Sequence, residues 1–118
     1  MLDYREYREA QNEVPAVKCA NEHQKAVFTN CYYAACDYIG GLENILQDYD
    51  EDDQEYINAL DTLKNHADLV AYIFYEGTHN EYGCGFAGPG HESQKHYRFA
   101  GKEFTQNAVE EIVKAMGH

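Results

Sequence analysis

Residues recur at intervals of three and four between positions 15 and 39, the spacing that places mostly apolar side chains on one face of an α-helix. The recurring positions and their apolar neighbours are Val17, Ala20, Gln24, Val27, Phe28, Cys31, Ala34, Ala35, Tyr38 and Ile39. Pro15 suits the first turn of such a helix, and Gly40 with Gly41 indicates its end or a kink. We therefore predict a long helix over residues 15–39, followed by a short helical segment over residues 42–49.

A second helical stripe covers residues 53–75, and its members are Tyr56, Leu60, Leu63, Ala67, Val70 and Phe74. Its last part, residues 69–75, is apolar on all sides and fits either a buried helix end or a buried strand. The unbroken stripe favours a helix. The acidic run before it, residues 48–53, predicts a solvated turn because its like charges repel one another, with Asp52 or Asp53 as the cap of the next helix.

The following stretch, residues 78–101, is rich in Gly, His and aromatic residues. Two short segments in it, residues 82–86 and 96–100, have the composition of strands. Gly and Pro at residues 87–90 are typical of a loop between such strands. The pattern therefore predicts a small β-hairpin.

A final helix is predicted near the end of the chain, with Thr105 as its N-cap and Gly117 as its stop. Its apolar face consists of Phe104, Ala108, Ile112 and Met116. These elements together predict a mainly α (α+β) fold: a compact helical domain with two long antiparallel helices, a small β-hairpin and a C-terminal helix. A chain of 118 residues is long enough for one core, so we expect residues 1–118 to form a single acidic domain.

Charge narrows the classes of partner. The chain has 21 Asp and Glu against 9 Lys and Arg, a formal net charge of −12. A field of this sign repels nucleic-acid backbones and anionic membranes, and it attracts basic proteins and cations. Direct nucleic-acid binding is disfavoured, because phosphate contacts need clustered Lys and Arg. Acidity that only keeps the protein in solution is the simpler alternative.

The chain shows no apolar run of the roughly 20 residues that a bilayer requires. Its first residues mix charged and apolar types, so we expect no signal peptide and a cytoplasmic location. The four cysteines are Cys19, Cys31, Cys36 and Cys84. Without a secretory signal, reduced thiols are the better interpretation than disulfides.

Four potential zinc ligands, namely His79, Cys84, His91 and His96, lie in the Gly-rich stretch 79–96. Zinc favours four nitrogen and sulfur ligands in a tetrahedron, and glycines would let the backbone fold around an ion. The spacing matches no common zinc pattern, so a polar loop without metal is the alternative. The acidic run also approaches a calcium-loop pattern, which fails because Asp53 replaces the required Gly and Ala59 the required Glu.

Catalytic patterns are weak. Cys84 could act as a nucleophile with His91 or His96 as its base. The sequence has no nucleophile elbow, no Cys-x-x-Cys motif and no phosphate-binding loop, and the glycines at residues 83–88 do not complete a dinucleotide-binding fingerprint. A non-enzymatic function is therefore favoured.

Tyrosine and carboxylate residues share the faces opposite the apolar stripes. Tyr72 shares its face with Asp61 and Asp68, and Tyr33 shares its face with Asp37. Exposed Tyr on a helix offers contact area at low entropy cost. The alternative is that both tyrosines pack on neighbouring elements. The acidic run adds two further candidate partner-binding residues, Asp50 and Asp52.

The residues do not resemble the signature of a known family, so the functional hypotheses rest on charge and chemistry. The first is a non-enzymatic binding protein whose acidic, Tyr-rich surface docks on a basic, nucleic-acid-binding protein and inhibits it, by analogy of size and charge with small phage or mobile-element inhibitors. It needs no cofactor. The second is a zinc site or metal-dependent enzyme in the stretch 79–96. The third is a structural homo-oligomer, such as a homodimer, held by residues 69–75.

Overall fold

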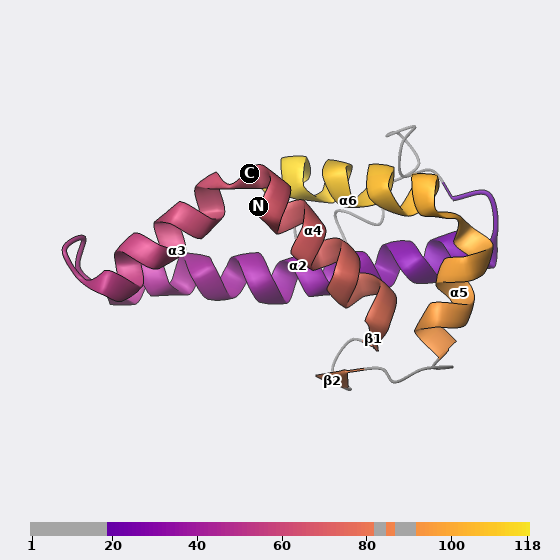
Figure 1. The fold of residues 1–118 in the computed structure, drawn as a ribbon, viewed down its shortest axis with the longest axis horizontal. Helices are drawn as coiled ribbons and strands as arrows, with labels where there is room; N and C mark the ends of the chain where they lie inside the picture. The colour runs from indigo at the N-terminus through magenta and orange to yellow at the C-terminus, as the bar shows by residue number, and fades with distance from the viewer. Residues whose placement is uncertain (1–18, 82–84, 87–91) are drawn as a thin grey trace.

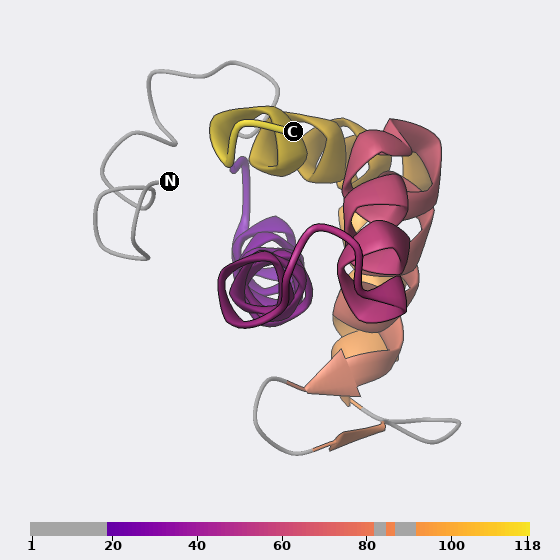
Figure 2. The same cartoon turned by 90° about the vertical axis from the view of Figure 1, so that its left-hand side faces the viewer.

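A long central helix organises the protein. The computed structural model describes residues 19–81, 85–86 and 92–118, and this part contains five helices: α2 (Glu22–Asp48), α3 (Gln54–Lys64), α4 (His66–His79), α5 (Glu92–Ala100) and α6 (Lys102–Ala115). Helix α2 contacts each of the other four and runs along the longest axis (Figure 1). Seen along that axis, α6 and the α3–α4 pair lie on different sides of α2 (Figure 2).

Helix α2 differs from its prediction at both ends. It begins at Glu22, because the side chain of Asn21 accepts a hydrogen bond from the backbone N–H of Gln24 at 2.9 Å and so caps the first turn. Residues 15–18 lie outside the described residues. Of the two alternatives predicted at Gly40 and Gly41, an end or a kink, the end is wrong, since the helix continues through both. Burial of apolar residues along α2 offsets the cost of two helical glycines.

The predicted helix over residues 53–75 is two helices. Asn65 lies between α3 and α4, where its Oδ1 accepts from the N–H of Asp68 at 3.1 Å and its Nδ2 donates to Asp68 Oδ2 at 2.7 Å. The first bond satisfies the backbone N–H of Asp68 as an N-cap does, and the second joins the two side chains. The chain changes direction at Asn65, so α3 and α4 are inclined to each other (Figure 1). Residues 69–75 are helical, as predicted.

The break also shifts the buried stripe. The buried residues of these two helices are Ala59 and Leu63 in α3 and Leu69, Ile73, Gly77 and Thr78 in α4. Of the predicted stripe, only Leu63 is among them. One continuous helical periodicity over residues 53–75 places the wrong side chains in the core, because a new helix with a different orientation begins after Asn65.

The predicted β-hairpin is wrong. Residues 96–100 belong to helix α5, where Tyr97 and Ala100 face the core at helical rather than strand spacing. Within the described residues, β structure is limited to the two-residue segments β1 (Asn80–Glu81) and β2 (Gly85–Phe86), which pair antiparallel next to the end of α4. The fold is therefore mainly α. Short segments flanked by glycines do not distinguish a strand from a short helix by composition alone.

Helix α6 completes the core. Its predicted face is confirmed at Ala108, Ile112 and Met116, which are buried. Thr105 is not the N-cap; it lies within the helix, where its buried hydroxyl donates to Gly101 O at 2.9 Å. Gly117 ends the helix as predicted. Its φ is +86° and the hydrogen bonds around it, from Gly117 N to Lys114 O and from His118 N to Val113 O, form a Schellman motif.

Gly41 and Gly117 both have room for a Cβ atom but differ in backbone conformation, so substituting them tests the assigned course of α2 and the assigned end of α6. An ideal Cβ at Gly41 or at Gly117 meets nothing within 4 Å. Gly41→Ala should raise the free energy of unfolding by about 0.5–1 kcal/mol, because Ala loses less backbone entropy in a helix. Gly117→Ala should lower it by about 1 kcal/mol, since φ is positive there. Urea unfolding measures both, and equal effects would contradict the assigned end of α6.

Candidate functional site

Two tyrosines from different helices form an exposed stacked pair. The rings of Tyr38 on α2 and Tyr72 on α4 lie 3.9 Å apart between centroids, with an interplanar angle of 22°. Tyr38 is half-buried against the core, whereas Tyr72 keeps 42% of its surface exposed. We call this pair the Tyr38–Tyr72 platform. The ring of Tyr72 is accessible to a partner, and stacking on the ring of Tyr38 holds its orientation.

Close packing of the two helices positions the platform. Gly77 of α4 faces Cys31 of α2, and a Cβ at Gly77 would lie 2.8 Å from the Cα of Cys31. Tyr38 follows Cys31 along α2, and Tyr72 precedes Gly77 along α4. The two contacts show that α4 crosses α2 in the antiparallel sense, so one helix pair supplies both the core contact and the exposed ring.

Carboxylates flank the platform. Asp68 lies one turn before Tyr72 and Glu76 one turn after it, and Asp37 precedes Tyr38. Burial raises the pKa of the Tyr72 hydroxyl, and the negative charge of Glu76 raises it further. The hydroxyl therefore stays protonated at neutral pH and can both donate and accept a hydrogen bond.

The other candidate partner-binding residues lie in different places. Tyr33 is half-buried against the core, with its ring edge to Tyr32 at a centroid distance of 6.2 Å. Asp61 is exposed on α3, which the bend at Asn65 separates from α4. Asp50 and Asp52 are exposed in the α2–α3 turn, at one end of the long axis (Figure 1). The structure thus brings Asp68 and Tyr72 together on α4 and sets Asp61, Asp50 and Asp52 apart from them.

Negative charge is concentrated in the first half of the fold. Lys64 is the one Lys or Arg between Lys25 and Lys95. Within the described residues, the carboxylates of the α2–α3 turn form no ion pair. The basic side chains of the last two helices are Lys95, Arg98, Lys102 and Lys114. Helices α2 to α4 therefore present a largely uncompensated negative surface, and the platform belongs to it.

Two of the four predicted zinc ligands, His79 and His96, lie within the described residues. Cys84 and His91 lie outside the described residues. His79 stacks on Tyr75 at 4.5 Å, and its Nδ1 lies 2.9 Å from the Tyr75 carbonyl oxygen. His96 instead meets His23 of α2, with 2.9 Å between their Nδ1 atoms. Among the residues that the structure describes, no three His, Cys, Asp or Glu side chains are grouped so that they could hold a metal.

The thiols that the structure describes are not placed for catalysis. Cys31 and Cys36 are free thiols. Burial raises the pKa of Cys31 to about 12 and also raises the pKa values of Cys19 and Cys36. A thiol is nucleophilic as its thiolate, so these three groups stay in their unreactive form at neutral pH.

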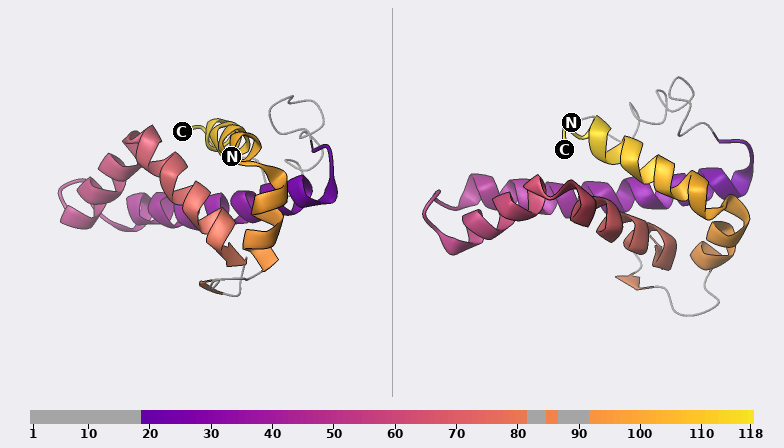
Figure 3. Two further views of the ribbon diagram at one scale, coloured as in Figure 1. Left: turned by 45° about the vertical axis from the view of Figure 1, so that its right-hand side comes forward. Right: turned by 45° about the horizontal axis from the view of Figure 1, so that its top comes forward.

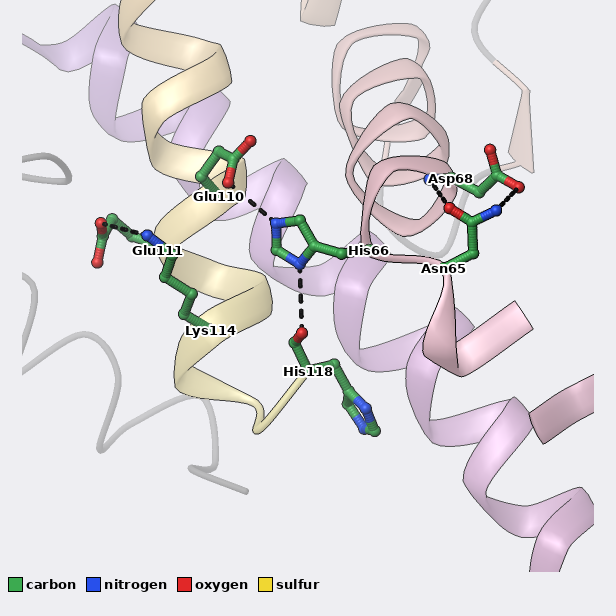
Figure 4. Close-up of polar contacts among 7 residues, drawn as sticks. All are labelled: Asn65, His66, Asp68, Glu110, Glu111, Lys114 and His118. Atoms are coloured by element: carbon green, nitrogen blue, oxygen red, sulfur yellow. Dashed lines mark hydrogen bonds and ion pairs between the residues drawn. The ribbon is translucent and has the colours of Figure 1, made fainter. Parts of the chain in front are cut away.

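A histidine network joins the start of α4 and the end of α6 to α2, and no local sequence pattern predicts it. His66 Nε2 lies 3.0 Å from Glu110 Oε2, and His66 Nδ1 lies 3.2 Å from the main-chain oxygen of His118 (Figure 4). The ring of His118 in turn lies 2.9 Å from Glu43 of α2. The hydrogen bond to Glu110 and then the one to the His118 oxygen raise the pKa of His66.

No protein-family model, curated protein or solved structure matches this chain. None of the helices in the described part of the chain is long and apolar enough to cross a membrane. The function must therefore be argued from the geometry and charge given above.

The His66 network predicts a pH-dependent contribution to stability. Both ring nitrogens of His66 face acceptors, so protonated His66 makes the better contacts. Because its pKa is raised on folding, this contribution is complete below the unfolded-state pKa of about 6.5 and is lost as pH rises through the folded-state pKa. The difference in melting temperature between the wild type and His66→Gln should therefore be larger at acidic than at alkaline pH. Glu110→Gln should show the same trend, and a difference independent of pH for both variants would contradict this assignment.

Proposed function

We propose that this protein is a non-enzymatic binding module that docks on a basic protein through the Tyr38–Tyr72 platform and the carboxylates beside it. The observation that carries the proposal is the exposure of Tyr72 while its ring is held by a stacking contact at 3.9 Å. Large aromatic side chains that are already ordered lose little entropy when they enter an interface. Such residues are frequent binding hot spots.

The surrounding charge defines the partner class. Asp68, Glu76 and Asp37 give the platform a negative rim, and α2 to α4 carry little compensating charge. Complementary charge accelerates encounter with a basic protein, and like charge discourages acidic partners and nucleic acids. An arginine side chain suits this surface best, because its guanidinium group stacks on a tyrosine ring and pairs with carboxylates.

The basic partner that we propose is a nucleic-acid-binding protein, since such proteins carry clustered Lys and Arg for phosphate contacts. Occupation of that surface by an acidic domain would compete with the nucleic acid. The protein would then act as an inhibitor. The support for this step is its charge and its small size.

Self-association through residues 69–75 has less support. Leu69 and Ile73 are fully buried in the protein's own core, and Val70 and Phe74 are half-buried against it. The exposed members of this segment are Ala71, Tyr72 and Tyr75. The apolar surface that the homo-oligomer hypothesis needs is thus largely used within the chain.

Binding of a fluorescein-labelled oligo-arginine peptide tests the platform. Tyr72→Ala should weaken binding about tenfold, the effect of losing 1.4 kcal/mol. Binding to the wild type should also weaken steeply between about 0.01 M and 0.1 M salt, over which the Debye length falls from about 30 Å to about 10 Å. Fluorescence anisotropy measures both effects.

A matched control separates the platform from general acidity. Tyr49 serves as the control because it has a similar exposure, 44%, and lies in the acidic α2–α3 turn, outside the platform. Tyr49→Ala should therefore leave the affinity within about twofold, below 0.5 kcal/mol. Asp68→Asn should weaken binding mainly at low salt. Equal losses for Tyr49→Ala and Tyr72→Ala, or an affinity that does not respond to salt, would overturn the proposal.

A further inference from the structure

Two histidines that are distant in the sequence meet where α5 packs on the start of α2. His23 lies in the first turn of α2 and His96 in the middle of α5, and their Nδ1 atoms are 2.9 Å apart. Both side chains are half-buried. The two views of Figure 3 show α5 beside the beginning of α2, at the end of the molecule opposite the α2–α3 turn.

A third ring packs against this pair. Phe99, one turn after His96 on α5, stacks on His23 with 4.7 Å between ring centroids and an angle of 28°. The His23 and His96 rings are 5.2 Å apart and tilted by 42°. Neighbouring turns of α5 therefore hold His23 from two directions, and the Nδ1 atoms are already directed toward one another.

Facing imidazole nitrogens are suited to a transition metal. In the hydrogen-bonded pair one Nδ1 carries the proton and the other accepts it. If both protons reside on Nε2, both Nδ1 lone pairs point to a common position. Two nitrogen ligands on a tetrahedral zinc ion lie about 3.3 Å apart, given Zn–N bonds of about 2.0–2.1 Å. Because the two nitrogens now point straight at each other, binding the ion requires them to separate by a few tenths of an ångström and both rings to turn toward a common position.

We propose that His23 and His96 bind one divalent transition-metal ion, with zinc as the main candidate, and that the ion links α2 to α5. Imidazole ligands suit zinc, copper and nickel, whereas magnesium and calcium prefer oxygen. Within the part of the chain that the structure describes, no third His, Cys, Asp or Glu side chain is grouped with this pair. Water completes the coordination, so the site is open and exchangeable. This inference is independent of the proposed docking function.

The site differs from the zinc site expected from the sequence. That expectation combined His96 with His79, Cys84 and His91 from the same stretch of chain. The structure instead pairs His96 with a histidine 73 positions away, while His79 stacks on Tyr75. Substitutions at His23 and His79 therefore distinguish the two sites.

Isothermal titration of metal-stripped protein with Zn²⁺, in an excess of Mg²⁺ that occupies the acidic surface, tests the proposal. The wild type should bind one ion, and its melting temperature should rise with zinc. His23→Gln and His96→Gln should each lose at least tenfold in affinity, and His79→Gln should bind as the wild type does.

Two outcomes would overturn the proposal. Zinc affinity that is unchanged by His23→Gln would show that the pair is a hydrogen-bonded contact without metal. A loss for His79→Gln but not for His23→Gln would assign the ion to the Gly-rich stretch instead. Because Gln keeps a hydrogen-bonding group at each position, melting temperatures without metal report whether a variant is folded.

Discussion

The arrangement of this protein depends on how closely α4 approaches α2. At the crossing, Gly77 faces Cys31, and a Cβ at Gly77 would stand 2.8 Å from the Cα of Cys31, a distance that real Cβ atoms do not tolerate. A hydrogen atom is thus the only side chain that fits. The contact sets the relative position of the two helices, buries Leu69 and Ile73, and brings Tyr72 over Tyr38. The exposed platform is therefore a consequence of the core packing beneath it.

Sequence periodicity predicted the helices whose signals are local and undisturbed. The end of α6 at Gly117 and its face through Ala108, Ile112 and Met116 follow from spacing and a single glycine. The break at Asn65 could also have been predicted, because Asn65 and Asp68 have capping-box spacing. An apolar stripe that continues across the break concealed it. The passage of α2 through Gly40 and Gly41 was not predictable, since tertiary packing there outweighs local propensity.

The candidate sites were likewise predictable only where they depend on local spacing within one helix. Helical spacing identified Tyr72 with Asp68, because residues four apart share a face. It could not identify Tyr38 as the stacking partner or His23 as the neighbour of His96, since both contacts depend on how separate helices pack. Residues 96–100 belong to a helix and not to the predicted strand. This helix places His96 beside His23 of α2.

The central claim is that the α2–α4 contact creates the platform in the free protein. NMR of a sample with labelled Tyr rings tests it directly through nuclear Overhauser effects between the rings of Tyr38 and Tyr72. We expect a strong cross-peak in the wild type and its loss or marked weakening in Gly77→Ala, a buried substitution that touches neither ring. Absence of the cross-peak in the wild type, or an unchanged cross-peak in a folded Gly77→Ala variant, would contradict it.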